Sequence, residues 1–463
     1  MTLGEARQLA RSLFLQTLPS LRVGPRVREA MRLAGEVVEI RGEVFPIPRA
    51  RPIRVVSVGK AAIEMADAAA QQLAGPPPEG NPPGTVAKAG SGPQAGAPFR
   101  GIVVAPGEPT SRRPEYEYFR GGHPYPDDGS WRAAEAVVQF LRGCTRDDLV
   151  LFLISGGGSA LLDKPLHSSV SLDDLRRFHE VLVTSGAAIE EINALRKHLS
   201  AVKGGRLAEQ AAPATQVSLY VSDVPEGLPS AVASGPTMPD ETTVADCIRI
   251  ITRYALLEKL HGPVRSLLES GAIAETPKPD DPCFARSRYH CLLSNADAVA
   301  ALEQAARSNG LRANCETGCD GWEFRRAADH LLGKLEKLRR EHPGRPAALV
   351  SGGELGCPVT GDGPSVGIGG RNQAFALYCA TRIEGKPVVV LSGGTDGIDG
   401  NSPAAGALAD GSTAGRAAAL RLKAEDFLRR SDSYHFFEKL GDTIQTGPTG
   451  TNVRDLRLLL AYA

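Results

Sequence analysis

The tripeptide Ser-Gly-Gly follows an apolar run at three places in the chain, beginning at Ser155, Ser351 and Ser392. Such runs predict strands that are covered on both faces of a parallel sheet. Ligands of parallel sheets bind beyond the carboxyl ends of the strands, where glycine lets backbone N–H groups approach a phosphate closely. Tight turns without a ligand are the alternative interpretation. The predicted phosphate-binding residues are Ser155, Gly156, Gly157, Gly158, Ser159, Gly352, Gly353, Gly393, Gly394 and Thr395.

Two cationic side chains stand at predicted helix starts. Lys60 follows a strand rich in β-branched residues and a single glycine, and Arg371 follows a glycine-rich loop. An ammonium group at a helix start can help to hold phosphate, and a guanidinium binds phosphoryl or carboxylate oxygens with two parallel hydrogen bonds. Taken alone, Lys60 also fits a solvated surface lysine and Arg371 a surface ion pair.

Three further basic residues, Arg196, Lys203 and Arg206, fall within a stretch predicted to be one helix over residues 189–211. Separations of seven and three residues place them near one helix face. The adjoining Gly204-Gly205 pair would allow close approach by a ligand, so an anion-binding face and an ordinary solvated face both fit. We assign these residues, with Asn372, to binding of an acidic substrate.

Carboxylates stand at the ends of other predicted strands, at Asp223, Glu354 and Asp396. Mg²⁺ prefers one or two carboxylates together with water and substrate phosphates, so these three residues are the predicted metal ligands. Asp223 is also a candidate general base. Aspartate in a glycine-rich turn is the simpler structural alternative.

Some familiar catalytic motifs are missing. No Gly-Lys pair is followed by the Ser or Thr of a P-loop, and no G-x-G completes the dinucleotide fingerprint. The order Ser365, Asp396, His435 matches a hydrolase triad, but a nucleophile elbow needs a strand before the serine. Pro364 stands directly beside Ser365, which makes that strand improbable.

The periodicity predicts strands that alternate with helices, and therefore an α/β fold with a mostly parallel sheet. We expect strands at residues 52–58, 101–105, 149–154, 216–221, 290–294, 347–350 and 387–391. We expect helices at residues 6–18, 27–34, 61–73, 131–141, 172–185, 189–211, 247–257, 263–268, 296–309, 322–340 and 372–382, with Ser130 as a helix cap. Residues 75–98 are predicted to be a surface loop, and the domains to span 1–282 and 283–463.

Composition excludes several classes of protein. Fifty-three basic and 53 acidic residues in 463 leave a formal net charge of zero, so no overall field attracts nucleic acid or an anionic membrane. The eight cysteines are scattered, and we expect reduced, mostly buried thiols. We find neither a signal-peptide pattern nor the ~18 apolar residues of a membrane span, which predicts a cytoplasmic protein.

The ordered motifs resemble those of the glycerate kinases that carry a C-terminal MOFRL domain. The segments that carry this resemblance run in order between Val56 and Leu456: SVGKAAIEMA, GHPYPDDGS, LFLISGGGSALL, LRKHLSAVKGGRLA, SDV, VASGPT, SGGE, GGRNQ, SGGTDGIDG and GPTGTNVRDL.

The resemblance implies a Rossmann-like N-terminal domain, a smaller C-terminal α/β domain, and an active site in the cleft between them. It also implies transfer of a phosphoryl group from ATP to D-glycerate, commonly at the 2-hydroxyl, with Mg²⁺, and makes Lys60 and Arg371 the catalytic pair. A homodimer is possible. A hydroxypyruvate reductase and a non-catalytic sensor of a small sugar acid are the alternatives.

Overall fold

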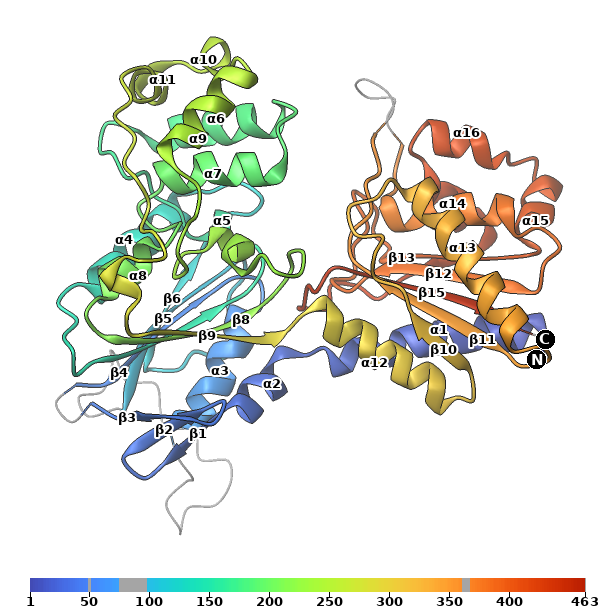
Figure 1. The fold of residues 1–463 in the computed structure, drawn as a ribbon, viewed down its shortest axis with the longest axis horizontal. Helices are drawn as coiled ribbons and strands as arrows, with labels where there is room; N and C mark the ends of the chain where they lie inside the picture. Colours follow the sequence, from blue (N-terminus) through green and yellow to red (C-terminus); the bar gives the residue numbers. More distant parts are fainter. Residues whose placement is uncertain (49–50, 75–97, 360–366, 463) are drawn as a thin grey trace. The chain divides into compact units, whose positions relative to one another are not determined.

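The computed structural model describes residues 1–48, 51–74, 98–359 and 367–462. The chain forms two compact units, shown as a ribbon in Figure 1. We call residues 23–292 the N-terminal unit, and residues 1–22 with 293–463 the C-terminal unit. This division differs from the one expected at 282/283, since the first helix packs in the C-terminal unit. The predicted surface loop falls outside the described residues, apart from Pro98.

The N-terminal unit is built on a six-stranded sheet with the order β6-β5-β4-β7-β8-β9. The pairs β6–β5, β5–β4, β4–β7 and β7–β8 are all parallel. The chain therefore starts in the middle, at β4, and winds first to one edge and then to the other. The strands are β4 (Ile53–Val58), β5 (Phe99–Ala105), β6 (Tyr116–Arg120), β7 (Leu149–Ile154), β8 (Thr215–Val221) and β9 (Ser287–Leu293).

Helices cover both faces of this sheet, and a separate helical layer stands beyond one of them (Figure 1). In this unit the described helices are α2 (Val23–Ala30), α3 (Ala62–Leu73), α4 (Asp128–Leu141), α5 (Gly158–Leu161), α6 (Leu172–Val183), α7 (Ile189–Leu199), α8 (Arg206–Ala211), α9 (Val244–Arg253), α10 (Leu256–Lys259) and α11 (Gly262–Glu269). Helices α6, α7, α9 and α11 share an apolar core of their own, centred on Phe178 and Leu195. The sheet and α4 enclose another, around Phe152 and Val137.

Three local predictions are wrong. The helix expected over 27–34 ends at Ala30, because residues 31–34 form the first strand of a three-stranded antiparallel sheet, β1 (Met31–Ala34), β2 (Val37–Ile40) and β3 (Glu43–Pro46). The cap of α4 is Asp127 rather than Ser130, since the Asp127 side chain accepts the Ser130 N–H. The helix expected over 189–211 ends at Leu199, and α8 begins only at Arg206.

The sheet of the C-terminal unit has the order β10-β11-β15-β12-β13-β14, and among its described strands only β10 and β11 pair in parallel. Strand β15 lies antiparallel between β11 and β12, so β11 and β12 end at the same edge. The strands are β10 (Arg312–Cys315), β11 (Ala347–Gly352), β12 (Val388–Gly394), β13 (Gly406–Asp410), β14 (Thr443–Ile444) and β15 (Asp455–Ala461). Its helices are α1 (Leu3–Ser20), α12 (Asn295–Ser308), α13 (Phe324–Glu341), α14 (Arg371–Arg382), α15 (Thr413–Ala419), α16 (Ala424–Arg429) and α17 (Ser433–Leu440).

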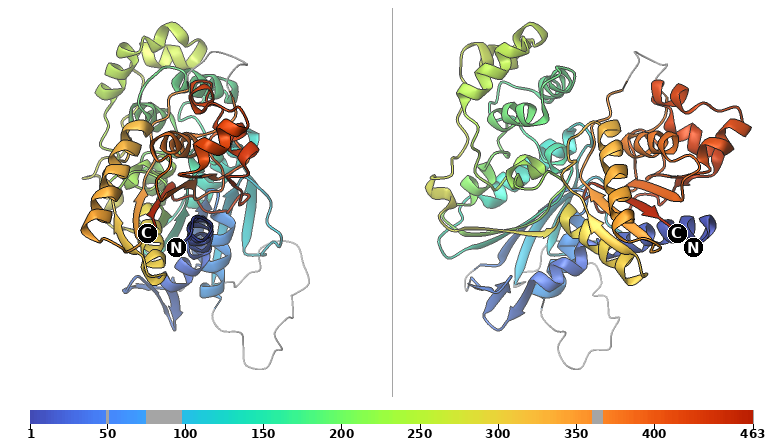
Figure 2. Two further views of the ribbon diagram at one scale, coloured as in Figure 1. Left: turned by 90° about the vertical axis from the view of Figure 1, so that its right-hand side faces the viewer. Right: turned by 45° about the vertical axis from the view of Figure 1, so that its right-hand side comes forward.

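Helix α1 closes the C-terminal unit although it begins the chain. It packs beside α12 against β12 and β15, and the two chain ends lie together in both views of Figure 2. The Arg7 guanidinium pairs with the buried carboxylates of Asp410 and Asp442. A Cβ on Gly393 would lie 2.7 Å from the Phe14 ring, so the ring rests directly on this glycine.

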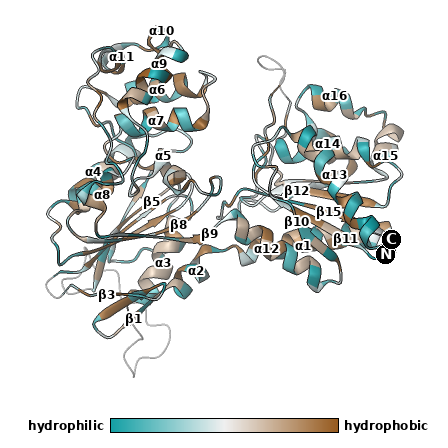
Figure 3. Ribbon diagram, in the orientation of Figure 1, coloured by the Kyte–Doolittle hydropathy of each residue, from teal (hydrophilic) through white to brown (hydrophobic). Residues whose placement is uncertain are grey.

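Hydropathy follows the layers: the central strands of both sheets are apolar, and the outer faces of the helices are polar (Figure 3). All eight cysteines are free thiols, and five are buried. None of the helices in the described part of the chain is both long and apolar enough to cross a bilayer.

Phe14 tests the role of α1. Its side chain is 0% exposed, so Phe14→Ala leaves a cavity against the end of β12 and lowers the free energy of unfolding by about 3–5 kcal/mol. Denaturant titration measures the loss. The neighbouring Leu15 is 42% exposed, and Leu15→Ala should change the stability by less than about 0.5 kcal/mol. Equal effects of both substitutions would contradict this packing.

Candidate functional site

The N-terminal site begins where β4 and β7 end, because the direction of winding changes between these neighbouring strands. Doubly wound sheets bind ligands at this switch point. The Lys60 N–H donates to the Gly156 carbonyl (2.9 Å), and the Ala61 N–H donates to Ser155 Oγ (3.0 Å). The turn that carries Lys60 is therefore tied to the first Ser-Gly-Gly turn.

We call residues 155–159 the glycine loop. Several of its backbone N–H groups are not used in hydrogen bonds within the described chain. Within the described part of the chain, the N–H groups of Gly156, Gly157, Gly158 and Ser159 have no hydrogen-bond partner. Gly157 has φ +82°, a left-handed conformation that favours glycine and that also occurs in anion-binding backbone nests. The loop thus has the chemistry of an anion-binding cradle.

Several side chains pack closely against the glycine loop. A Cβ on Gly157 would meet both the Lys60 side chain (3.1 Å) and the His123 ring (3.3 Å). One on Gly156 would collide with the Asp223 carboxylate, and one on Gly158 would lie 2.8 Å from Ala233. The structure therefore brings Lys60, Asp223 and the glycine loop together, and adds His123, which the sequence predictions had not assigned to the site.

The turn at residues 233–235 contacts the glycine loop and has a strained backbone. Ala233, Ser234 and Gly235 have φ of 50°, 60° and 60°, which is unusual for the two non-glycine residues. The Ser234 and Ser159 hydroxyls lie 2.8 Å apart and share a hydrogen bond. Strain of this kind persists where surrounding contacts enforce it, which is common at functional sites.

The three basic residues expected on one helix face do not share a helix. Gly204 and Gly205 have φ of +57° and +85°, so the helix cannot continue through them. Arg206 begins α8 and donates to backbone carbonyls at Ala274 and Glu275. Arg196 is partly exposed on α7.

Lys203 is enclosed in the N-terminal unit. Its ammonium lies 2.5 Å from Asp163, and both side chains are 1% exposed. The Ser200 hydroxyl donates to the same carboxylate (2.8 Å). Burial opposes the charge of Asp163, but the pKa of this carboxyl stays below its usual value because of Lys203. Burial lowers the pKa of the adjacent His179 to about 3, which keeps that ring neutral.

Arg371 begins α14 and is held by two carboxylates of the C-terminal unit. Its Nε and Nη2 donate to Asp455 (2.6 and 3.2 Å), and Nη2 lies 2.7 Å from Glu354. Although burial opposes the charge, Asp455 and Glu354 raise the pKa of Arg371 above its ordinary value. Nη1 has no partner among the described residues, so its N–H groups remain available.

The start of α14 is already capped. The Asp399 carboxylate accepts the N–H groups of Asn372 (3.0 Å) and Gln373 (2.8 Å). Burial raises the pKa of Asp399 to about 7 against the effect of these donors. Asn372, predicted to bind substrate, is 1% exposed, and its side chain accepts a hydrogen bond from Ser392.

The two other Ser-Gly-Gly turns use their donors internally. The Gly353 N–H donates to Asn295 (2.8 Å), the Gly394 N–H to the Ala405 carbonyl (2.8 Å) and the Thr395 N–H to the Arg454 carbonyl (3.0 Å). Gly352 and Gly393 pair with Leu456 of β15 from either side. These turns place α12, α1 and β15 next to one another, and they lack the open donors of the glycine loop.

The predicted carboxylates do not form a metal cage. Among the described residues, no group of three or more His, Cys, Asp or Glu side chains has the arrangement of a metal site. Glu354 pairs with Arg371, while the Asp396 carboxylate accepts the Ile398 N–H (3.1 Å). The hydrolase alternative finds no support in the described residues: His435 pairs with Asp432 (2.6 Å), and Ser365 lies outside them.

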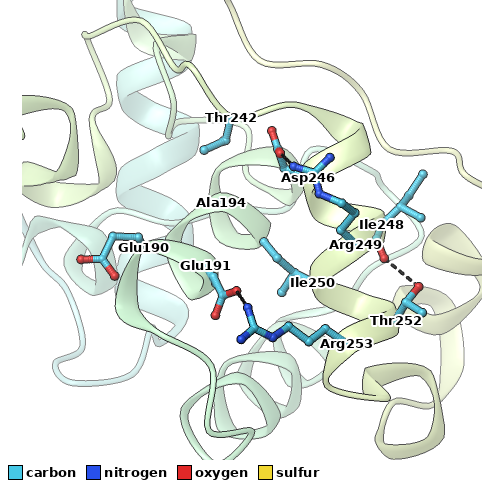
Figure 4. Close-up of a pocket in the computed structure, with 10 residues that line it drawn as sticks. All are labelled: Glu190, Glu191, Ala194, Thr242, Asp246, Ile248, Arg249, Ile250, Thr252 and Arg253. Carbon is cyan, nitrogen blue, oxygen red and sulfur yellow. Dashed lines mark hydrogen bonds and ion pairs between the residues drawn. The ribbon is translucent and has the colours of Figure 1, made fainter.

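Several cavities of the N-terminal unit are lined by residues outside the glycine loop. One, of about 700 Å³, runs between α7 and α9, where Glu191 and Arg253 face each other 3.2 Å apart (Figure 4). No predicted site residue lines it. In the C-terminal unit a pocket of about 610 Å³ includes Arg371 in its wall, together with Cys357 and Phe427.

The chain is a two-unit α/β protein whose N-terminal unit carries the glycine loop at the switch point of a doubly wound sheet. Residues 9–269 match the family described as "Domain of unknown function (DUF4147)", and residues 347–455 match the MOFRL family. The chain belongs to the glycerate kinase family with a C-terminal MOFRL domain.

Several relatives place the chain in this family. It is 36% identical to a D-glycerate 2-kinase of Thermotoga maritima over 92% of this chain and 97% of that protein. It is 39% identical to a protein of Agrobacterium vitis provisionally named hydroxypyruvate reductase, over 74% and 77% of the two chains. A crystal structure of glycerate kinase from Thermotoga maritima aligns with a TM-score of 0.79 and 32% identity, covering 99% of this chain and 100% of that one.

The enclosure of Lys203 leads to a stability prediction. Lys203→Met leaves Asp163 as a buried, unpaired carboxylate, so the free energy of unfolding should fall by about 3–5 kcal/mol in a denaturant titration. Adding Asp163→Leu removes that charge and should recover part of the loss. Lys337, 69% exposed, supplies the control, because Lys337→Met should leave stability nearly unchanged. A fully stable Lys203→Met protein with weakened binding of acids would instead favour the substrate role.

Proposed function

We propose that this protein is a kinase that transfers the γ-phosphoryl group of ATP to the 2-hydroxyl of D-glycerate. The observation that carries the proposal is the glycine loop, with its open N–H groups beside Lys60, in a chain of the glycerate kinase family. Phosphoryl transfer requires alignment of the reacting oxygens and neutralisation of charge more than covalent help.

In this proposal the glycine loop binds phosphate oxygens and Lys60 neutralises charge on the transferring group. Arg371 acts on the same group through Nη1, while Asp455 holds the guanidinium by two hydrogen bonds. Of the residues assigned to the substrate carboxylate we retain Arg196, which is partly exposed. Lys203, Arg206 and Asn372 act instead through structure, since each is buried.

The residues beside the glycine loop fit an Mg²⁺ ion that binds together with ATP. Mg²⁺ is usually bound by one or two carboxylates plus substrate phosphates, and the Asp223 carboxylate lies beside the proposed phosphate site. Asp223, which lies against Gly156 of the glycine loop, would hold the ion, and Glu354 and Asp396 stay weaker candidates. When bound, Mg²⁺ supplies charge neutralisation at the phosphates. The cytoplasmic location and the homodimer stay predictions.

Substitution of the two cations tests the proposed chemistry. Lys60→Met and Arg371→Met should each lower kcat about 10²- to 10³-fold, because each removes a positive charge from the transition state. If both act on one phosphoryl group, the double variant should lose less than the product of the two single effects. Phosphorus NMR of a mixture of ATP, Mg²⁺ and D-glycerate reports both the rate and the position of the new phosphate.

The exposed Arg345 supplies a matched control, since Arg345→Met should keep the full rate. The name of the Agrobacterium vitis relative makes hydroxypyruvate reduction the second candidate. Loss of NADH or NADPH absorbance with hydroxypyruvate, without ADP formation from glycerate, would replace the kinase with a reductase. Calorimetric binding of glycerate with neither reaction would indicate a sensor.

A further inference from the structure

We propose that His123 is the general base of the N-terminal site, and that its imidazole accepts the proton of the hydroxyl that is phosphorylated. This inference rests on the proposed function and adds the group that removes the proton. His123 lies between β6 and α4, in a surface loop with no assigned role, and its side chain is partly open to solvent.

The backbone that leads to His123 is fixed at several points. The Gly121 N–H donates to the Ala105 carbonyl (3.1 Å), and the Gly122 N–H donates to Ser130 Oγ (2.9 Å). A Cβ on Gly121 would lie 2.4 Å from the Leu161 carbonyl oxygen, so the loop runs in close contact with the end of α5. His123 is thereby held beside the helix that follows the glycine loop.

His123 and Lys60 share one point of contact with the glycine loop. The position of a Cβ on Gly157 lies 3.3 Å from His123 Cδ2 and 3.1 Å from Lys60 Cγ, so both side chains lie on the same side of this glycine. Any phosphate held by the loop would therefore be close to an ammonium and to an imidazole. Those are the groups needed to neutralise the phosphoryl group and to activate its acceptor.

The electrostatic surroundings favour the neutral, basic form of His123. Partial burial and the charge of Lys60 together lower its pKa below the ordinary histidine value. Asp127 belongs to the same loop, but its carboxylate caps α4 through Ser130. Asp223 contacts the loop at Gly156 rather than at Gly157. Neutral imidazole is the form that can accept a proton.

The transfer step balances with these groups alone. The substrate hydroxyl gives its proton to an imidazole nitrogen as its oxygen forms a bond to the γ-phosphorus. The bond from that phosphorus to the β,γ-bridging oxygen breaks, and ADP leaves with the electron pair. The imidazolium then releases its proton to water, helped by repulsion from Lys60. A general base of this kind contributes about 10²- to 10⁴-fold to turnover.

The test is the pH dependence of kcat in His123→Gln. The wild-type protein should lose kcat as pH falls through an apparent pKa below that of an ordinary histidine, since protonated His123 cannot act as a base. His123→Gln should lower kcat at neutral pH about 10²-fold or more and remove this acidic limb. The exposed His261, changed to Gln, is the control and should keep both rate and profile.

A second measurement, of the titration of His123, does not depend on kinase activity. NMR titration of the imidazole signals in Lys60→Met should show the pKa of His123 rising, because the charge of Lys60 lowers it in the wild-type protein. An unaltered acidic limb in His123→Gln, or an unmoved His123 titration in Lys60→Met, would overturn the inference and leave the kinase proposal intact. A wild-type protein that forms no phosphoglycerate from ATP and glycerate would overturn the proposed function, and the role of His123 with it.

Discussion

Two hydrogen bonds between neighbouring turns determine the geometry of the N-terminal site. They join the backbone after β4 to the glycine loop after β7, through the Gly156 carbonyl and the Ser155 hydroxyl. They form because β4 and β7 pair in parallel and end at the same level. Gly59 permits the approach, since a Cβ there would lie 2.2 Å from Ser155 Oγ. The positions of the loop donors and of Lys60 relative to one another depend on this contact.

A different constraint organises the C-terminal unit. Strand β15 enters between β11 and β12 and brings Asp455 to the edge where both neighbours end. Arg371 is then held by Asp455 and Glu354 in one orientation, which leaves Nη1 as its free end. Arg457, 0% exposed, donates to the carbonyls of Gly352 and Gly353 (2.8 Å each) and closes the same edge from inside. Paired charges hold this unit together at the edge that carries Arg371.

The sequence predicts those elements whose structure depends on the local pattern of residues. The apolar run before Ser155 predicts β7, and the rule for strand ends predicts a turn at the carboxyl edge of the parallel sheet, where the structure brings Lys60 and the glycine loop together. Prediction failed where distant segments decide the structure. Neither the insertion of β15 nor the packing of Phe14 on Gly393 has a local signal. The helix break before Arg206 had one, the Gly204-Gly205 pair, but helical periodicity on both sides concealed it.

The three Ser-Gly-Gly turns show why identical tripeptides need not share a role. At Gly352 and Gly393 the missing side chains make room for Asn295 of α12 and Phe14 of α1, and neighbouring N–H groups bond within the unit. At Gly157 the missing side chain leaves room beside Lys60 and His123, while the N–H groups have no partner in the described chain. A glycine turn can bind an anion only if its N–H groups are not already hydrogen-bonded to other protein groups, because each N–H has a single hydrogen to donate. Of the three turns, the one after β7 meets that condition, which is why the chemistry of the N-terminal unit is assigned there.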